Sequence, residues 1–170
     1  MRTRNAEWLR RWEATVPPGA HPASVSFAGM VREGRRTARA GTGLPLVVTY
    51  EDRLVGQVTV TGITWGSARW GQVGYWIDSR MAGRGVTPTA VAMVADHCFD
   101  VVGLHRLEIA VRPENAASLR VAEKLGFRRE GHALRYLHID GDWRDHVLFA
   151  LTAEETRRGV LADYLRSRRG

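Results

Sequence analysis

The sequence predicts a mixed α/β fold, in which helices flank a central sheet that contains both parallel and antiparallel strands. First, three strand-like runs follow one another through residues 44–77 with short connections, as antiparallel strands do. Second, a helix-like segment and then another strand follow them, the order that produces a parallel crossover. The length of 170 residues suits one domain, so we expect residues 1–170 to form a single unit.

Two helices are predicted before the first strand. Residues 5–15 favour a helix that the Pro-Pro-Gly run at 17–19 stops. Residues 24–40 favour a second helix, with Ser24 as its N-cap and the Gly-Thr-Gly run at 41–43 at its end. The chain therefore reaches its first strand after two helices.

The next three elements are strands. LPLVVTY (44–50) and RLVGQVTVTGI (53–63) flank the short turn Glu51-Asp52, and WGQVGYWI (70–77) follows. We expect these three strands to pair in sequence.

Helices and strands then alternate. Residues 88–102 predict a helix, because apolar side chains recur along one stripe. HRLEIAV (105–111) predicts a strand that ends before Pro113, which cannot donate a ladder hydrogen bond. Residues 115–125 predict a short helix closed by Gly126.

A hairpin and a last helix complete the chain. The runs LRYLHI and WRDHVLFAL lie on either side of Asp140-Gly141, which is a strong hairpin signal. Thr152 and Glu155 form a capping box that would open a basic C-terminal helix over residues 152–170.

Composition narrows the functional classes. No apolar run is long enough for a membrane span, the N-terminal residues resemble no secretion signal, and the single cysteine, Cys98, cannot form an internal disulfide. We therefore expect a cytoplasmic protein. The net charge of +7 suits nucleic acid, a polyanionic cofactor or an acidic protein surface. Because no nucleic-acid motif is visible, direct nucleic-acid binding is not expected.

The segment SRMAGRGVTPTA (79–90) joins the third strand to the next helix. It carries an RxxGxG pattern formed by Arg80, Gly83 and Gly85, followed by Thr87 as a predicted N-cap. Free N–H groups at such a helix start form an anion site. The alternative reading is an ordinary strand-to-helix turn, since short glycine motifs often arise by chance.

Neighbouring motifs favour the anion site. GYWI, RxxGxG, HRLEIAVRPEN and NAASLRVAEKLGFRREG occur in one order between residues 8 and 152. This arrangement resembles the GNAT acyltransferase superfamily, and most closely its Rim-type ribosomal-protein alanine N-acetyltransferases. The resemblance implies a GNAT-like fold, acetyl-CoA as cosubstrate and direct attack of an amine on the thioester. The family's first strand has no counterpart in this sequence.

The resemblance also implies a cofactor site. Backbone N–H groups of the loop would bind the pyrophosphate of acetyl-CoA, namely those of Gly83, Arg84, Gly85, Val86 and Thr87. Arg80 or Arg84 would add positive charge. The strand that ends in Tyr75, Trp76 and Ile77 would pair with the pantetheine arm.

Three groups are implied to act near the thioester. Asn115 can cap its helix and also bind the cofactor arm, and Ser118 would stabilise the departing thiolate. Other GNAT enzymes use a tyrosine at the position of Ala122. A backbone N–H of Trp76 or Ile77 would polarise the thioester carbonyl, as in an oxyanion hole.

The general base is not evident. Positions where relatives carry a glutamate hold Leu137 and Gln72, which leaves Glu108, Tyr136 and His138 as weak candidates. At pH 7.5 roughly a third of α-amines are neutral, against about one in a thousand lysines. A site without a strong base therefore suits a protein N-terminus.

Two other functions stay open. The same fold could acetylate a small amine such as a drug or polyamine, or the chain could be a non-catalytic module that binds CoA or nucleic acid. Cys98 is interpreted as a buried core residue, and we expect no metal site. Trp65, Trp70 and Trp143 could line an acceptor groove or simply pack. Homodimer formation also stays open.

Overall fold

The computed structural model describes residues 1–20 and 26–168, in which six strands form one mixed sheet. The strands are β1 (Leu44–Tyr50), β2 (Arg53–Thr64), β3 (Trp70–Ile77), β4 (Arg106–Val111), β5 (Arg128–Ile139) and β6 (Asp142–Thr152). Their order across the sheet is β1-β2-β3-β4-β6-β5, and the β3–β4 pair is parallel whereas the others are antiparallel. The predicted mixed α/β fold is confirmed. In the described residues no strand precedes β1, which lies at the sheet edge.

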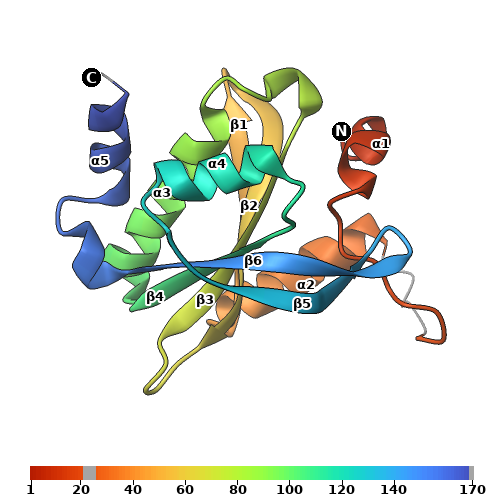
Figure 1. Cartoon of the computed structure of the whole chain (residues 1–170), viewed down its shortest axis with the longest axis horizontal. Coiled ribbons are helices and arrows are strands. Elements are labelled where there is room, and N and C mark those ends of the chain that lie inside the picture. The colour runs from red at the N-terminus through yellow and green to blue at the C-terminus, as the bar shows by residue number, and fades with distance from the viewer. Residues whose placement is uncertain (21–25, 169–170) are drawn as a thin grey trace.

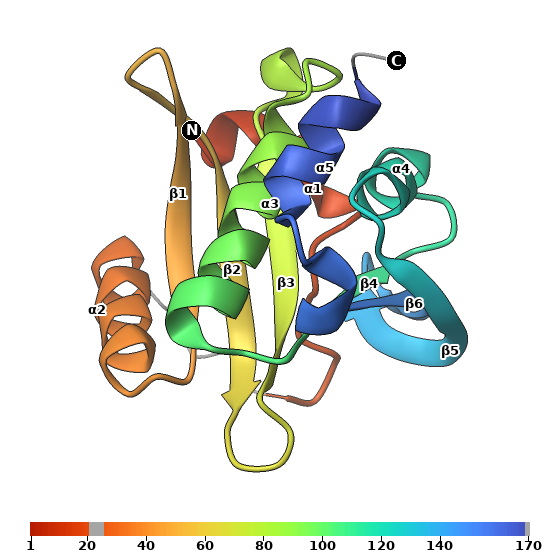
Figure 2. The same ribbon diagram turned by 90° about the vertical axis from the view of Figure 1, so that its left-hand side faces the viewer.

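Among the described residues, five α-helices and four short helical turns surround the sheet. They are η1 (Thr3–Asn5), α1 (Ala6–Arg10), α2 (Phe27–Arg39), η2 (Ser79–Met81), α3 (Val86–His97), η3 (Cys98–Val102), α4 (Ala116–Lys124), η4 (Ala153–Thr156) and α5 (Val160–Ser167). Figures 1 and 2 show α3 and α5 together on one face of the sheet and α1 on the other. Among the described residues, no helix has both the length and the apolar composition that a bilayer span needs.

The main core lies between the sheet and α3. Val73 of β3 and Ile109 of β4 pack in one buried cluster with Val91 and Cys98. Cys98 is fully buried, and burial raises the pKa of its thiol to about 11. This confirms the interpretation of Cys98 as a core residue, because a thiol with so high a pKa is a poor nucleophile.

The N-terminal segment is less helical than predicted. The helix expected over residues 5–15 ends at Arg10, and the chain beyond it turns along the sheet, where Ala14 forms a bridge with Ile139. Tertiary contacts to the β5–β6 hairpin replace the last predicted helical turns. The second helix begins at Phe27, and the Oγ atom of Ser26 caps it by accepting from Gly29 N–H at 3.1 Å. The predicted cap, Ser24, lies outside the described residues.

The helix after the glycine loop begins earlier than predicted. α3 starts at Val86 with Gly85 as its N-cap, so Thr87 lies inside the first turn rather than at the cap. Gly85 has φ +81°, a left-handed conformation in which glycine is favoured, and this allows the earlier start. Pro88 fits into the first turn of α3, because N–H groups in a first helical turn have no intrahelical partner and the proline therefore loses no hydrogen bond.

The C-terminal region differs from a single helix over residues 152–170. The capping box of Thr152 and Glu155 is present, but it opens the short turn η4. The helix α5 starts at Val160, where the Asp96 carboxylate of α3 accepts from the N–H groups of Val160 at 2.6 Å and Leu161 at 3.1 Å. This acceptor pair fixes a separate helix start, which sequence reasoning could not locate.

Three local predictions are confirmed. Asp140 and Gly141 have φ of 49° and 84°, as a tight hairpin turn of this kind requires. Asn115 caps α4, and Gly126 follows that helix with φ +76°. The strand before the hairpin turn is longer than predicted, since β5 begins at Arg128 and crosses two register shifts.

Candidate functional site

The parallel strands β3 and β4 separate after a short ladder. Their register pairs run from Trp70–Arg106 to Gln72–Glu108. Beyond these pairs lies a cavity of about 160 Å³, lined by three consecutive residues of each strand: Val73, Gly74, Tyr75, Ile109, Ala110 and Val111. Because successive side chains of a strand point to opposite faces, a cavity that touches three in a row lies in the gap of the sheet itself and borders both faces.

One face of this cavity belongs to the core and α4. Asn115 Oδ1 accepts from Ser118 N–H at 3.1 Å, while Tyr75 Oη donates to the Ser118 carbonyl at 3.2 Å. Burial raises the pKa of Tyr75 to about 12, so its hydroxyl stays a neutral donor. Both Asn115 and Ser118 line the cavity. These two bonds fix the Ser118 backbone, and its Oγ atom makes no hydrogen bond to a described residue.

The opposite side of the cavity carries an aromatic ring, a guanidinium and an imidazole. Trp12, Arg112 and His146 line it. The Arg112 guanidinium lies 5.5 Å from the centre of the Trp12 ring and donates to the Arg11 carbonyl at 2.7 Å. The stretch after α1 thus contributes to the lining of this side, and Figure 1 shows α1 on the face of the sheet away from α5.

The glycine loop presents unpaired backbone donors. Gly83 and Gly85 have φ of +77° and +81°. Within the described residues, none of the N–H groups of residues 83–87 donates a hydrogen bond. A Cβ atom at Gly85 would lie 3.1 Å from Nη1 of Arg168, so the end of α5 brings a guanidinium to this loop.

The two predicted arginines of the loop have other contacts. Arg80 pairs with Asp78 at 3.1 Å, and Arg4 pairs with the same carboxylate at 2.5 Å. The Arg80 hydrogen bond holds the pKa of Asp78 well below its ordinary value. Arg84 lies over the Tyr50 ring at 5.5 Å. Arg80 therefore anchors the start of the loop to a buried carboxylate.

The β2–β3 ladder distinguishes the two predicted carbonyl-polarising N–H groups. The N–H of Asp78 donates to the Val55 carbonyl at 2.7 Å, and hydrogen-bonded positions alternate along an antiparallel ladder. Trp76, which pairs with Gln57, therefore directs its N–H toward β2. Ile77 directs its N–H away from β2, to the side on which β3 has separated from β4, and neither Trp76 nor Ile77 lines the cavity. Of the two groups, Ile77 is the available donor and Trp76 is engaged.

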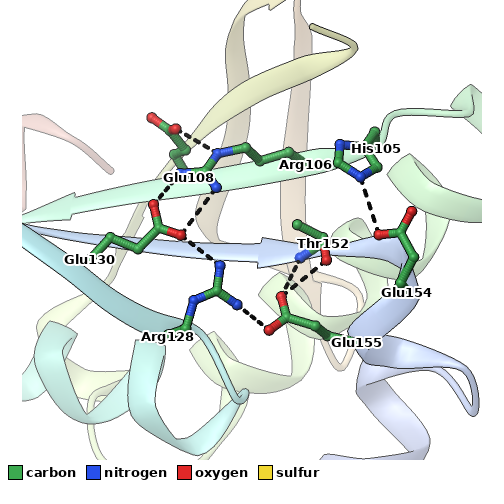
Figure 3. Close-up of polar contacts among 8 residues, drawn as sticks. All are labelled: His105, Arg106, Glu108, Arg128, Glu130, Thr152, Glu154 and Glu155. Carbon is green, nitrogen blue, oxygen red and sulfur yellow. Dashed lines mark hydrogen bonds and ion pairs between the residues drawn. The ribbon is translucent and has the colours of Figure 1, made fainter.

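The weak base candidates are engaged elsewhere. Figure 3 shows Glu108 beside Arg106, to which it pairs at 2.8 Å, in a network that continues to Glu130 and Arg128. Tyr136 Oη accepts from Gln72 Nε2 at 3.3 Å. The Nδ1 atom of His138 lies 2.7 Å from Thr15 Oγ1. None of these three candidates lines the cavity, and neither does Leu137.

The predicted tryptophans are not at the cavity either. Trp65 donates to the Gly41 carbonyl at 2.9 Å, and Trp143 packs on His138 with ring centres 5.8 Å apart. Trp70 lies in the short β3–β4 ladder. The tryptophan that lines the cavity is Trp12, which sequence reasoning missed together with His146 and Arg168. No local pattern marks these three residues, because their neighbours at the site are distant in sequence.

A split between two parallel strands, followed by a glycine loop with free N–H groups, defines a class of acyl-transfer enzymes. Residues 3–128 match the Acetyltransferase (GNAT) domain family, and the chain belongs to it. The protein is an acetyl-CoA-dependent N-acetyltransferase.

Particular relatives narrow the comparison. The chain is 33% identical over 157 residues to the [Ribosomal protein uS5]-alanine N-acetyltransferase of Escherichia coli, covering 91% of this chain and 80% of the relative. It is 39% identical to the solved structure of Mycobacterium smegmatis RimJ in complex with CoA-disulfide, with a TM-score of 0.91 over 99% of this chain and 81% of that one. The probable N-acetyltransferase YjcK of Bacillus subtilis is 40% identical over 101 residues, 59% of this chain and 56% of the relative.

Proposed function

We propose that this protein transfers the acetyl group of acetyl-CoA to the α-amine of a protein N-terminus that begins with a small residue, alanine or serine. The similarity to the Escherichia coli enzyme, which is named for alanine acetylation of ribosomal protein uS5, supports an acceptor of the ribosomal-protein type. The observation that carries the proposal is the cavity through the sheet. In this proposal a thioester would enter from the α4 side and an extended peptide end from the side of Trp12, because residues of both sides line the cavity. The proposal assigns the whole chain, residues 1–170, to one acetyltransferase domain.

The residues present fit acetyl-CoA. The free N–H groups of residues 83–87 would bind its pyrophosphate, aided by Arg168 and Arg84. The open edge of β3 at Tyr75 and Ile77 would pair with the pantetheine arm as an added strand does. The Asn115 amide, whose oxygen already caps α4, keeps its N–H₂ for that arm.

Two groups would act on the thioester. The Ile77 N–H, directed away from β2, would stabilise negative charge on the carbonyl oxygen. The Ser118 hydroxyl would donate a hydrogen bond to the departing CoA thiolate. A hydroxyl is a weak acid, so we assign it stabilisation of the thiolate rather than full proton transfer.

The lack of a carboxylate among the described residues that line the cavity favours an α-amine over a lysine as the acceptor. The positions of the family's usual glutamates, Gln72 and Leu137, bring no carboxylate to the cavity. The pKa gap between the two amines is about 2.5 units, which corresponds to roughly 3.4 kcal/mol of deprotonation cost.

Mass spectrometry of paired peptides tests the acceptor. One peptide has a free N-terminal alanine and no lysine, and the other has a blocked N-terminus and one internal lysine. We expect acetylation of the first at a rate at least about tenfold higher, a fraction of what the pKa gap allows. Faster acetylation of the blocked peptide would contradict the proposal. Inertness of both, with activity on spermine, would favour a small-amine substrate instead.

A further inference from the structure

The β5–β6 hairpin carries two buried histidines with different surroundings. His138 is bonded to Thr15, whereas His146 lines the cavity and is 3% exposed. In the described part of the chain, every fully buried side-chain nitrogen or oxygen has a hydrogen-bond partner. The Nε2 atom of His146 has no such partner there, so the described residues do not fully enclose it, and His146 lines the cavity.

The other nitrogen of His146 defines the tautomer. Nδ1 lies 3.1 Å from the Arg144 carbonyl oxygen, which can only accept a hydrogen bond. Nδ1 therefore carries the proton, and Nε2 presents a lone pair. The Tyr136 ring, with its centre 5.4 Å from the imidazole, holds the ring in place.

His146 and Ser118 lie at opposite sides of the gap. Val147 pairs with Val111, and both side chains are in the core beneath the helices. Because side chains alternate along a strand, the preceding residue, His146, points to the other face of the sheet. Ser118 belongs to α4, on the helical side. A thioester in the gap would thus have a hydroxyl on one side and an imidazole lone pair on the other.

We propose that His146 is the general base that accepts the proton of the attacking amine, which rests on the acyl-transfer function proposed above. The nitrogen lone pair of the amine attacks the thioester carbon and forms the C–N bond. Nε2 of His146 takes one proton from that nitrogen. The C–S bond then breaks, its electron pair leaves on sulfur, and Ser118 stabilises the thiolate. The imidazolium returns its proton to solvent or to the thiolate.

The surroundings of the imidazole suit an N-terminal amine. Burial is the main cause that lowers the pKa of His146 below its ordinary value, and the Arg112 guanidinium acts in the same direction. The hydrogen bond to the Arg144 carbonyl and the carboxylates of Glu114 and Asp145 oppose this shift. The imidazole is therefore neutral at pH 7. Such a weak base suits an α-amine, whose pKa is about 7.7–8.0, much better than a lysine.

Steady-state kinetics of His146→Gln test this role. The acceptor is whichever amine the wild-type protein acetylates, peptide or spermine. We expect kcat to fall by on the order of 10²-fold, while the Kd for acetyl-CoA stays within about threefold. The wild-type kcat should also fall more steeply toward acid pH than that of the variant, because protonation of His146 adds to protonation of the acceptor amine, which occurs with both proteins. Free imidazole should restore part of the activity of His146→Ala.

His138→Gln is the matched control, because this buried histidine of the same hairpin does not line the cavity. We expect it to keep kcat within about twofold and to retain the steeper acid decrease. If His146→Gln keeps the kcat of the wild-type protein and its pH dependence, the assignment of His146 as the general base is overturned. So does a wild-type kcat that falls toward acid pH no more steeply than protonation of the acceptor amine requires overturn it, even if the variants do not fold. If the wild-type protein acetylates spermine but no peptide, the proposed protein N-terminal acceptor is wrong, whereas the assignment of His146 as the base is unaffected.

Discussion

At the residue scale, Ser118 has its backbone fixed by one neighbouring and one distant side chain, while its hydroxyl makes no hydrogen bond to a described residue. Asn115 accepts from its N–H, and Tyr75, from the strand β3, donates to its carbonyl. Because the tyrosine is buried and its pKa is raised, the donor keeps its proton at all physiological pH values. The hydroxyl is thus held at one position on the cavity wall without loss of its donor capacity.

Ser118→Ala tests this arrangement. A hydrogen bond to a charged group contributes about 1.5–3 kcal/mol, so kcat should fall by roughly 10- to 100-fold. The Kd for acetyl-CoA should change little, because the interaction forms mainly with the departing thiolate. Ser26→Ala, which removes a helix cap far from the cavity, is the control and should leave kcat unchanged. Wild-type kcat in Ser118→Ala would remove the hydroxyl from the mechanism.

At the element scale, the junction between β3 and α3 combines three features that suit an anion. Gly85 is the left-handed cap of α3, the N–H groups of residues 83–87 are unpaired within the described chain, and Arg168 of the α5 end lies against the same loop. A free helix N-terminus carries partial positive charge. Packing of α5 on α3 brings the full positive charge of the Arg168 guanidinium to this loop. The order of motifs in the sequence does not reveal this contact.

Aspartate at either loop glycine tests the phosphate site. In Gly83→Asp and Gly85→Asp, a carboxylate faces the phosphates, and at Gly85 the side chain also meets Arg168. We expect the Kd for acetyl-CoA, measured by titration calorimetry, to rise at least about tenfold, equivalent to 1.4 kcal/mol. Gly62→Asp is the control, because Gly62 has φ +62° and open space but lies in β2. It should lose stability without losing affinity. Unchanged affinity in both loop variants would refute the assignment.

At the scale of the whole molecule, an ion-pair network connects strands that are not adjacent in the sheet. Arg106 of β4 pairs with Glu130 of β5, and the strand β6 lies between them in the sheet order. Arg128 binds Glu130 at 2.6 Å and also Glu155 of η4, as Figure 3 shows. The arginine hydrogen bonds, first that of Arg106, lower the pKa of Glu130 to about 2. The network therefore links β4, β5 and the C-terminal turn.

The acid dependence of stability tests this network. The pKa of Glu130 is lower in the folded chain, so its contribution is complete above about pH 4.5 and is lost as the pH falls toward about 2. Glu130→Gln should be less stable at pH 7 by about 1 kcal/mol, or 2–4 °C in Tm, and the difference should vanish at about pH 2. Glu123→Gln, an exposed α4 residue without an ion pair among the described residues, is the control. An equal Tm of wild type and Glu130→Gln at pH 7 would contradict the prediction.

The sequence by itself determined the features that depend on neighbouring residues. The strands from Leu44 to Ile77, the Asn115 cap, the Asp140-Gly141 turn and the glycine loop all follow from local propensity and backbone conformation. Where these local signals coincided with motifs, the family and its cosubstrate could also be predicted.

Tertiary structure decided what depends on contacts between distant segments. The end of α1 at Arg10, the start of α5 beside Asp96, and the gap between β3 and β4 all arise from packing that no local pattern encodes. The same holds for the cavity wall, where His146 of β6 and Trp12 near the N-terminus meet Ser118 of α4. A lone histidine in a strand carries no signal of its own, because its chemistry depends on burial, tautomer and neighbours that folding alone brings together.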